Sequence, residues 1–198
     1  MEQILCRNKK HKKRKGNKMK KTIIILLMAF TSGVLFAQEA GRLVKLTSKE
    51  KQDSIVESQY RLNKYMLENR DFVLEANYLQ DRRGNRRIVN STINFVAVDS
   101  TTAIIQVGSD YRNGPNGVGG VTAKGRITRW VLTENKKQKS FSLSINVMTS
   151  IGFYDLFFSI GSWGNSTARL SGLSAGELIF EGNVEPYSAS RVYEGHSL

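Results

Sequence analysis

Ser140-Phe141-Ser142-Leu143-Ser144-Ile145-Asn146-Val147 is the stretch that decides the fold class of this chain. Apolar and polar residues alternate in it without interruption. Successive side chains of a β-strand point to opposite faces, so this pattern predicts a strand with one face buried and the other in water. A sheet that is buried on one face only is typical of antiparallel architectures.

The same period of two continues on both sides of this strand. Short turns rich in Gly, Asn, Asp and Ser separate the segments, and no helical crossover follows residue 70. Parallel strands need such crossovers, so the sequence predicts a mainly β fold: an antiparallel β-barrel or a two-sheet sandwich of about eight or nine strands. The other expected strands are 71–79, 86–90, 94–98, 102–108, 121–133, 153–160, 167–170 and 177–184.

One helix is expected before the strands, from Thr47 to Arg70. Thr47 and Glu50 form a capping-box pattern, and the segment contains neither Pro nor Gly. A loose apolar stripe at helical spacing, which includes Tyr60 and Leu67, predicts that the helix packs on the β-domain. Binding of a partner by the same stripe is the alternative.

The residues before this helix indicate export. Met19–Ala37 has the three parts of a signal peptide: two lysines, an apolar run over 23–36 that is shorter than the roughly 20 residues of a membrane span, and a small residue before Gln38. Cleavage after Ala37 predicts a periplasmic or secreted protein with no integral membrane span, and an uncleaved N-terminal anchor is the alternative. Residues 1–18 are expected to be a basic upstream extension that is either not translated or disordered. Residues 38–70 are then the N-terminal segment with the helix, and 71–195 form the β-domain.

Export changes the meaning of the net charge. The formal charge is +13, but residues 1–37 hold ten of the 30 basic residues and one of the 17 acidic ones, so the remaining part carries +4. This is an ordinary surface charge for a small domain. The sequence therefore predicts no nucleic-acid partner.

The supply of catalytic and metal-binding side chains is small. Cys6 is the only cysteine, and His196 is the only histidine after Ala37. A Ser-His-Asp triad and a zinc site with His or Cys ligands are therefore excluded from the mature part. Oxygen-ligand sites such as those for calcium stay open, but no particular metal site and no cofactor is expected. Carboxylate chemistry needs two acids about 5–10 Å apart. The candidates are Asp99, Asp110, Asp155, Glu177 and Glu181, with Asp155 placed between Phe153 and Phe157 on one strand face.

A glycine-rich loop at residues 113–120 is the first candidate for ligand binding. Successive backbone amides of such a loop can form a concave site for an anion. The loop lacks the Lys-Ser/Thr of a phosphate loop, which argues against a nucleotide. The competing interpretation is a β-connection that needs positive φ angles. The candidate residues are Asn113, Gly114, Asn116, Gly117, Gly119 and Gly120.

A cluster of arginines on one hairpin is the second candidate. Arg82, Arg83, Arg86 and Arg87 surround a turn whose only acid is Asp81. Guanidinium groups bind phosphate, sulfated glycans or lipid headgroups, although such clusters also serve as soluble strand tips. Trp163 is the third candidate, because its Ser-Trp-Gly-Asn turn predicts an exposed ring.

Three segments together resemble those of a known family: residues 72–76 continuing into 79–84, the loop 114–120, and the C-terminal segment 190–195. The sequence is similar to small secreted β-rich proteins of Bacteroidetes that are classed as a domain of unknown function. The resemblance covers about 71–195. It implies a periplasmic or secreted β-rich domain with a helical N-terminal extension, and it implies no activity, cofactor or catalytic residue.

These observations favour a non-enzymatic domain of the cell envelope that binds a small ligand or a protein partner. In a barrel, the small residues Ala76, Ala123 and Gly125 on inward faces would leave room for a cavity. Two alternatives remain: a carboxylate-based hydrolase of envelope glycans, and a structural subunit of an envelope assembly that docks through the helix or an edge strand.

Overall fold

A computed structural model of the chain describes residues 47–109, 114–173 and 176–198. The predicted signal peptide and upstream extension lie outside these residues. So do Asp110 and Asn113, two of the candidate residues.

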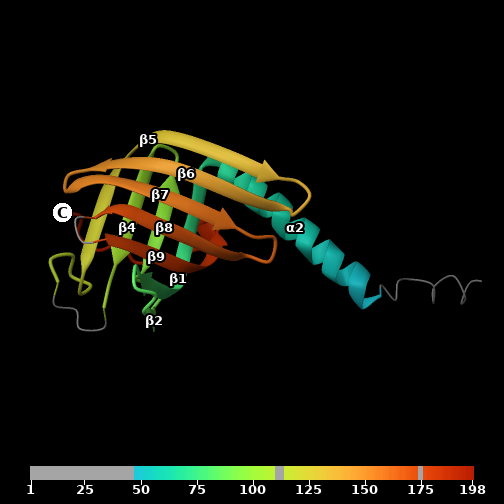
Figure 1. Cartoon of the computed structure of the whole chain (residues 1–198), viewed down its shortest axis with the longest axis horizontal. Helices are drawn as coiled ribbons and strands as arrows, with labels where there is room; N and C mark the ends of the chain where they lie inside the picture. The colour runs from blue at the N-terminus through green and yellow to red at the C-terminus, as the bar shows by residue number, and fades with distance from the viewer. Residues whose placement is uncertain (1–46, 110–113, 174–175) are drawn as a thin grey trace, which may run out of the picture. The chain divides into compact units, whose positions relative to one another are not determined.

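The strands form a closed antiparallel barrel (Figure 1). Eight strands follow the order β1-β3-β4-β5-β6-β7-β8-β9, and β9 returns to pair with β1. β2 is an extra strand on β1, paired at residues 78–80, next to the stretch 71–75 that pairs with β3. The barrel form of the prediction is therefore confirmed. The strands are β1 (Asp71–Asp81), β2 (Arg86–Ile88), β3 (Phe95–Asp99), β4 (Thr102–Val107), β5 (Val121–Asn135), β6 (Ser140–Thr149), β7 (Gly152–Ile160), β8 (Asn165–Leu173) and β9 (Gly176–Glu185).

The helix α2 (Ser48–Asn69) precedes the barrel, as predicted. Its capping box is formed: the Glu50 carboxylate accepts a hydrogen bond from the Thr47 amide at 2.7 Å, and the Thr47 hydroxyl accepts one from the Glu50 amide at 3.4 Å. The positive φ of Arg70 (55°) then ends the helix and turns the chain into β1.

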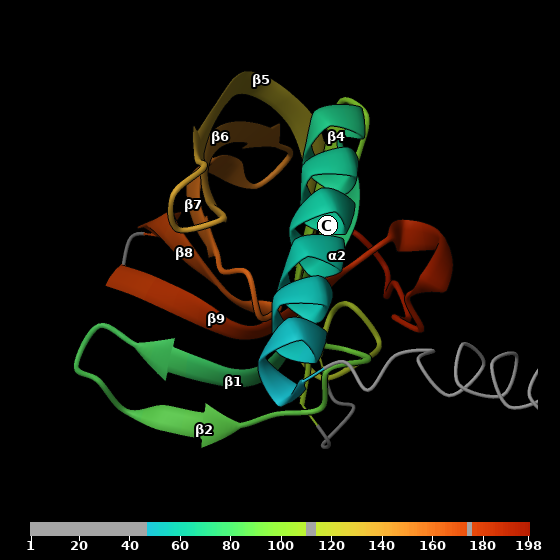
Figure 2. The same ribbon diagram turned by 90° about the vertical axis from the view of Figure 1, so that its right-hand side faces the viewer.

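The second half of α2 covers one end of the barrel (Figure 2). Met66 and Leu67 are buried in the barrel core. Tyr60 stacks on Phe141 with ring centroids 5.3 Å apart, and the Asn63 side chain donates a hydrogen bond to the Gly161 carbonyl at 3.2 Å. The apolar stripe of the helix thus serves the core, and this end of the barrel is filled.

The strand alternation fails at one point in β1. Strict alternation from Phe72 would place Tyr78 on the same face as Phe72, but a β-bulge between Ala76 and Tyr78 reverses the alternation. Leu79 consequently points into the core and Tyr78 points outward. Bulges add twist and curvature, which a sheet needs in order to close.

The C-terminal residues 190–198, called here the C-terminal strap, cover the outer wall of the barrel. Val192 packs on a second apolar cluster formed by Val73, Phe95, Ala97 and Ile104. The buried Gln106 side chain donates to the Tyr193 carbonyl at 2.8 Å and accepts from the Gly195 amide at 2.8 Å. The strap therefore provides two of the four hydrogen bonds of this buried side chain, which also donates to the Ile93 carbonyl and accepts from the Thr122 hydroxyl.

Candidate functional site

The open end of the barrel holds an apolar pocket of about 380 Å³, called here the mouth pocket. In an antiparallel barrel, alternate connections lie at opposite ends. The mouth end carries the β1–β2, β4–β5, β6–β7 and β8–β9 connections, whereas α2 covers the other end. The described lining residues of the mouth pocket are Ile105, Val107, Gly120, Val121, Ala123, Ile151, Tyr154, Leu170 and Leu178.

Small and medium side chains, which make up most of the lining, explain why the barrel is hollow at this end. An eight-stranded barrel is just wide enough either to be filled by side chains or to hold one small ligand. Large rings fill the covered end, where Phe72 lies edge-on to Phe158 with centroids 5.5 Å apart. At the mouth, Ala123 and Val121 stand where such rings would be needed to close the space.

Ala123 was one of three small residues expected to leave room for a cavity, and it lines the mouth pocket. The other two do not line it. Ala76 is buried in the packed core, and Gly125 allows a close backbone approach, since an ideal Cβ there would lie 2.2 Å from the Met148 carbonyl oxygen.

Tyr154 is the one lining side chain with a polar atom among the nine described lining residues. The residue is 8% exposed, and its hydroxyl has no hydrogen-bond partner within the described part of the chain. Since every fully buried side-chain polar atom in that part has a partner, this hydroxyl is within reach of solvent. The mouth pocket is therefore apolar with a single hydroxyl at its surface.

The glycine-rich loop is organised by the buried side chain of Asn116. The Asn116 oxygen accepts hydrogen bonds from the amides of Val118 (3.1 Å) and Gly120 (2.9 Å). Its nitrogen donates to the Val107 carbonyl (3.3 Å) and to the Thr122 hydroxyl (3.1 Å). One side chain thus ties the loop to the ends of β4 and β5.

These contacts explain most of the glycines in the loop. Gly117 and Gly119 have positive φ angles of 76° and 79°. An ideal Cβ on Gly114 would lie 2.3 Å from the Gly120 amide nitrogen, and one on Gly120 would lie 2.0 Å from the Val107 oxygen. The amides of Gly117, Val118 and Gly120 already donate within the loop, so an anion nest cannot use these three.

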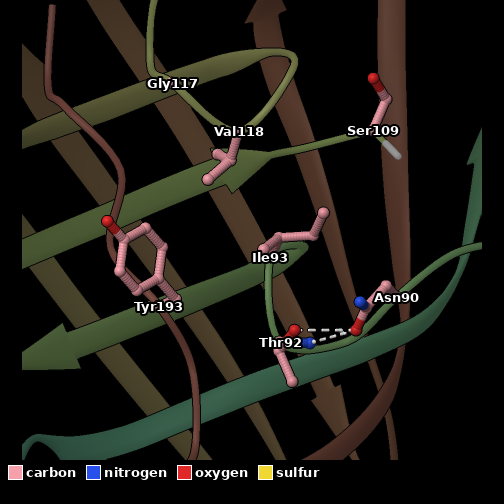
Figure 3. Close-up of a pocket in the computed structure, with 7 residues that line it drawn as sticks. All are labelled: Asn90, Thr92, Ile93, Ser109, Gly117, Val118 and Tyr193. Carbon is pink, nitrogen blue, oxygen red and sulfur yellow. Dashed lines mark hydrogen bonds between the residues drawn. The ribbon is translucent and has the colours of Figure 1, made fainter. Parts of the chain in front are cut away.

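A second pocket, of about 520 Å³, lies on the outer wall beside this loop (Figure 3). Gly117 and Val118 form one side, Tyr193 of the C-terminal strap stands opposite Ser109, and Asn90 and Thr92 come from the segment before β3. The Asn90 oxygen is occupied by the Thr92 amide (3.1 Å) and hydroxyl (2.8 Å). This pocket is the more polar of the two, and Ser109 adjoins the undescribed residues 110–113.

The arginine cluster divides into two pairs. Arg86 is engaged: it forms an ion pair with Glu181 at 2.6 Å, and its guanidinium lies 3.5 Å from the ring centroid of Tyr78. Arg87 shares the strand β2 and is exposed. Arg82 and Arg83 occupy the β1–β2 turn at the mouth end and are exposed.

The remaining candidates do not converge on either pocket. Trp163 is exposed (61%), as predicted, but it lies in the β7–β8 turn at the covered end. Asp155 is on the outer face of β7, where it accepts a hydrogen bond from Asn146. Glu177 pairs with Arg169 at 3.6 Å. Within residues 47–109, 114–173 and 176–198, no three His, Cys, Asp or Glu side chains form a metal-binding group.

Comparison with known proteins identifies the family. The model of the domain of unknown function DUF4251 matches residues 55–184, which includes most of α2 as well as the barrel. The chain belongs to the DUF4251 family. The chain also resembles a crystal structure of a DUF4251 family protein from Bacteroides eggerthii DSM 20697, with 26% identity and a TM-score of 0.57. That match covers 67% of this chain and 91% of the other. No curated protein matches this DUF4251 chain.

The resemblance noted in the sequence is thereby confirmed, and the matched family brings no activity with it. In the described part of this DUF4251 chain, no helix combines the length and apolar character of a membrane span. Sequence reasoning missed the mouth pocket as a set of residues. Its lining comes from five strands and two of the connections between them, and only the register of the closed barrel brings these positions together.

Proposed function

We propose that this DUF4251 domain is a non-enzymatic binding protein that works in the periplasm or after secretion, and that it holds a small apolar ligand in the mouth pocket. The observation that carries the proposal is the apolar lining of a pocket at one end of the barrel, above a core of buried apolar side chains. Ligand sites are typically concave, largely preformed and apolar, with volumes of about 300–1,000 Å³. Export follows from the sequence pattern of Met19–Ala37.

The rim of the mouth pocket supports the same proposal. Val121 and Ile151 belong to its lining and are each 42% exposed, so apolar surface continues from the pocket to the outside. Burying such surface under an apolar ligand stabilises a complex by about 25 cal/mol per Å². Hydrolysis has less support, because the described carboxylates lie on the outer wall or in ion pairs rather than across a cleft.

A matched pair of variants tests the proposal. Val121 and Val131 lie on the same strand and are equally exposed, at 42%, but only Val121 lines the mouth pocket. Titration of the purified protein with the neutral apolar dye N-phenyl-1-naphthylamine should show saturable binding with a blue-shifted emission. Val121→Trp should weaken this binding at least about tenfold, which corresponds to about 1.4 kcal/mol, and Val131→Trp should leave it unchanged. Absence of saturable binding, or equal effects of both variants, would contradict the proposal.

The export part has its own test. N-terminal sequencing of the protein isolated from the cells that make it should give Gln38 as the first residue. A first residue within 1–19 would overturn the cleavage hypothesis without affecting the binding proposal.

A further inference from the structure

We propose that the ligand of the mouth pocket is an amphiphile with an anionic headgroup, whose apolar chain lies in the pocket and whose headgroup is held at the rim by Arg82 and the Tyr154 hydroxyl. This inference rests on the proposed function and goes beyond it by naming the class of ligand. The headgroup chemistry is a carboxylate or a phosphate.

Tyr154 provides the first line of evidence. A tyrosine that is buried to this degree usually has a hydrogen-bond partner for its hydroxyl. Here the residue is 8% exposed and belongs to the barrel core, and its hydroxyl, which solvent can reach, has no partner among the described residues. An ideal Cβ on Gly152 would lie 3.7 Å from this hydroxyl, which places it beside the β6–β7 turn at the mouth end. The pocket therefore offers one unused donor next to its opening.

Arg82 provides the second, independent line. An ideal Cβ on Gly176 would lie 3.7 Å from the Cδ atom of Arg82, so the aliphatic stem of Arg82 lies against the start of β9. Leu178, two residues further along β9, lines the mouth pocket. Packing of the stem against the barrel while the charged group stays in water is the usual behaviour of arginine. Arg82 is not itself a lining residue, but its stem lies beside the strand that contributes Leu178 to the pocket.

The acids around this rim do not neutralise Arg82. The Asp81 carboxylate accepts hydrogen bonds from the amides of Arg83 (2.8 Å) and Asn85 (2.9 Å) and from the Asn85 side chain (2.8 Å). The side-chain hydrogen bond from Asn85 and the backbone one hold the pKa of Asp81 below its usual range, so this acid stays charged but faces the turn.

The two nearby glutamates have other partners. Glu181 pairs with Arg86, and Glu177 pairs with Arg169. Within the described part of the chain, neither Arg82 nor Arg83 takes part in an ion pair with N–O distances up to 4.0 Å. The positive charge of the β1–β2 turn is thus available to an incoming anion.

The combination distinguishes an amphiphilic anion from a neutral apolar ligand. Charge-assisted hydrogen bonds are roughly twice as strong as neutral ones, and arginine binds carboxylates and phosphates in a bidentate manner. At an exposed rim, we expect the Arg82 contact alone to strengthen binding up to about fivefold, and the Arg82 and Tyr154 contacts together to strengthen it about tenfold.

Three ligands with ten carbon atoms each test the inference: decanoate, decyl phosphate and decan-1-ol. Calorimetric titration of the purified protein should give decanoate and decyl phosphate an affinity at least about tenfold higher than that of decan-1-ol. Tighter binding of the phosphate than of the carboxylate indicates a lipid phosphate as the natural headgroup, and the reverse indicates a fatty acid. Either order supports the proposal.

Two variants and a control assign the preference to its residues. Arg82→Gln should abolish most of the preference for the anions and leave the affinity for decan-1-ol unchanged. Tyr154→Phe keeps the ring and removes the donor, so it should reduce anion binding by a smaller factor, about threefold. Lys137→Gln removes the same charge at the β5–β6 turn, at the covered end of the barrel, and should have no effect. Circular dichroism and melting curves check that each variant is folded.

The outcomes separate the two proposals. If all three ligands bind equally and Arg82→Gln changes none of the affinities, the headgroup inference is wrong and the apolar site remains. If none of the three binds and the neutral dye does not bind either, the proposed function itself is wrong.

Discussion

Replacement of Asn116 by Ala tests how the glycine-rich loop is held on the barrel. The side chain is fully buried and makes four hydrogen bonds, two as acceptor and two as donor. Gly120 and Val107 are partly exposed, so water can replace Asn116 at their backbone groups. The Val118 amide and the Thr122 hydroxyl lie on buried residues, where a lost hydrogen bond is harder to replace.

The expected loss of stability follows from these two buried groups. The buried Val118 amide loses its partner, which costs about 1–3 kcal/mol, whereas the Thr122 hydroxyl keeps its hydrogen bond to Gln106 and loses only one contact, worth about 1 kcal/mol. The free energy of unfolding should therefore fall by about 2–4 kcal/mol. For a domain of this size, each kcal/mol corresponds to about 2–4 °C, so the melting temperature should fall by about 5–15 °C. The effect should be measured by urea unfolding followed by tryptophan fluorescence, since Trp130 packs on Phe72 in the core.

Asn183→Ala is the matched control, because Asn183 is exposed on β9. Surface substitutions of this kind usually change stability by less than about 0.5 kcal/mol. A loss below about 1 kcal/mol for Asn116→Ala would contradict the reasoning. It would mean that the hydrogen bonds of Asn116 do not hold the loop.

Three further substitutions address the barrel seam, the helix and the response to acid. Gly182→Ala would place a Cβ 1.8 Å from the Glu75 carbonyl oxygen across the β1–β9 seam. Overpacking typically costs about 1–3 kcal/mol, and we expect the free energy of unfolding to fall by about 3 kcal/mol. Ser171→Ala on β8 is the control and should be tolerated. Leu67→Ala should lower the free energy of unfolding by about 2–5 kcal/mol, because the side chain is fully buried where α2 covers the barrel. A loss below about 1 kcal/mol would show that the helix is not part of the cooperative core. Hydrogen bonds from the Tyr60 hydroxyl, which has the larger effect, and from Lys64 lower the pKa of Glu134. The ionised Glu134 therefore stabilises the fold at pH values above the pKa that it has in the unfolded chain, and this stabilisation is lost as the pH falls below about 4. Acid titration of Glu134→Gln should therefore show a shallower loss of stability than that of the parent protein, and identical acid curves would contradict this role.

The period of two in β6 predicted the most reliable part of the fold. Phe141, Leu143, Ile145 and Val147 all point into the core, as the alternation requires. The helix was equally predictable, because Thr47 and Glu50 cap it by local contacts that need no knowledge of the rest of the fold. Barrel closure could not be predicted, because the β1–β9 pairing joins strands about a hundred residues apart. The alternation pattern of the strands is also the same in a sandwich as in a barrel.

The candidate site shows the same division between local and distant information. Glycines in the loop 114–120 predicted an unusual backbone, but not that the Asn116 side chain would occupy the amides that an anion would need. The arginine cluster was visible as a run of charge. Its division into Arg86, which pairs with Glu181, and Arg82, which lies against Gly176, depends on the position of β9.

The distribution of side-chain size along the barrel axis links the fold to the proposed binding. Ring-bearing residues at the covered end pack against each other and against α2, so the barrel gains its stability there. The mouth end is then free to be lined by Val107, Val121 and Ala123 without a gap in the cooperative core. A stable covered end and a preformed open end are what an apolar ligand needs, because a rigid pocket reduces the ordering cost of binding. The two ends therefore have different tasks, and substitutions such as Leu67→Ala and Val121→Trp should separate stability from binding.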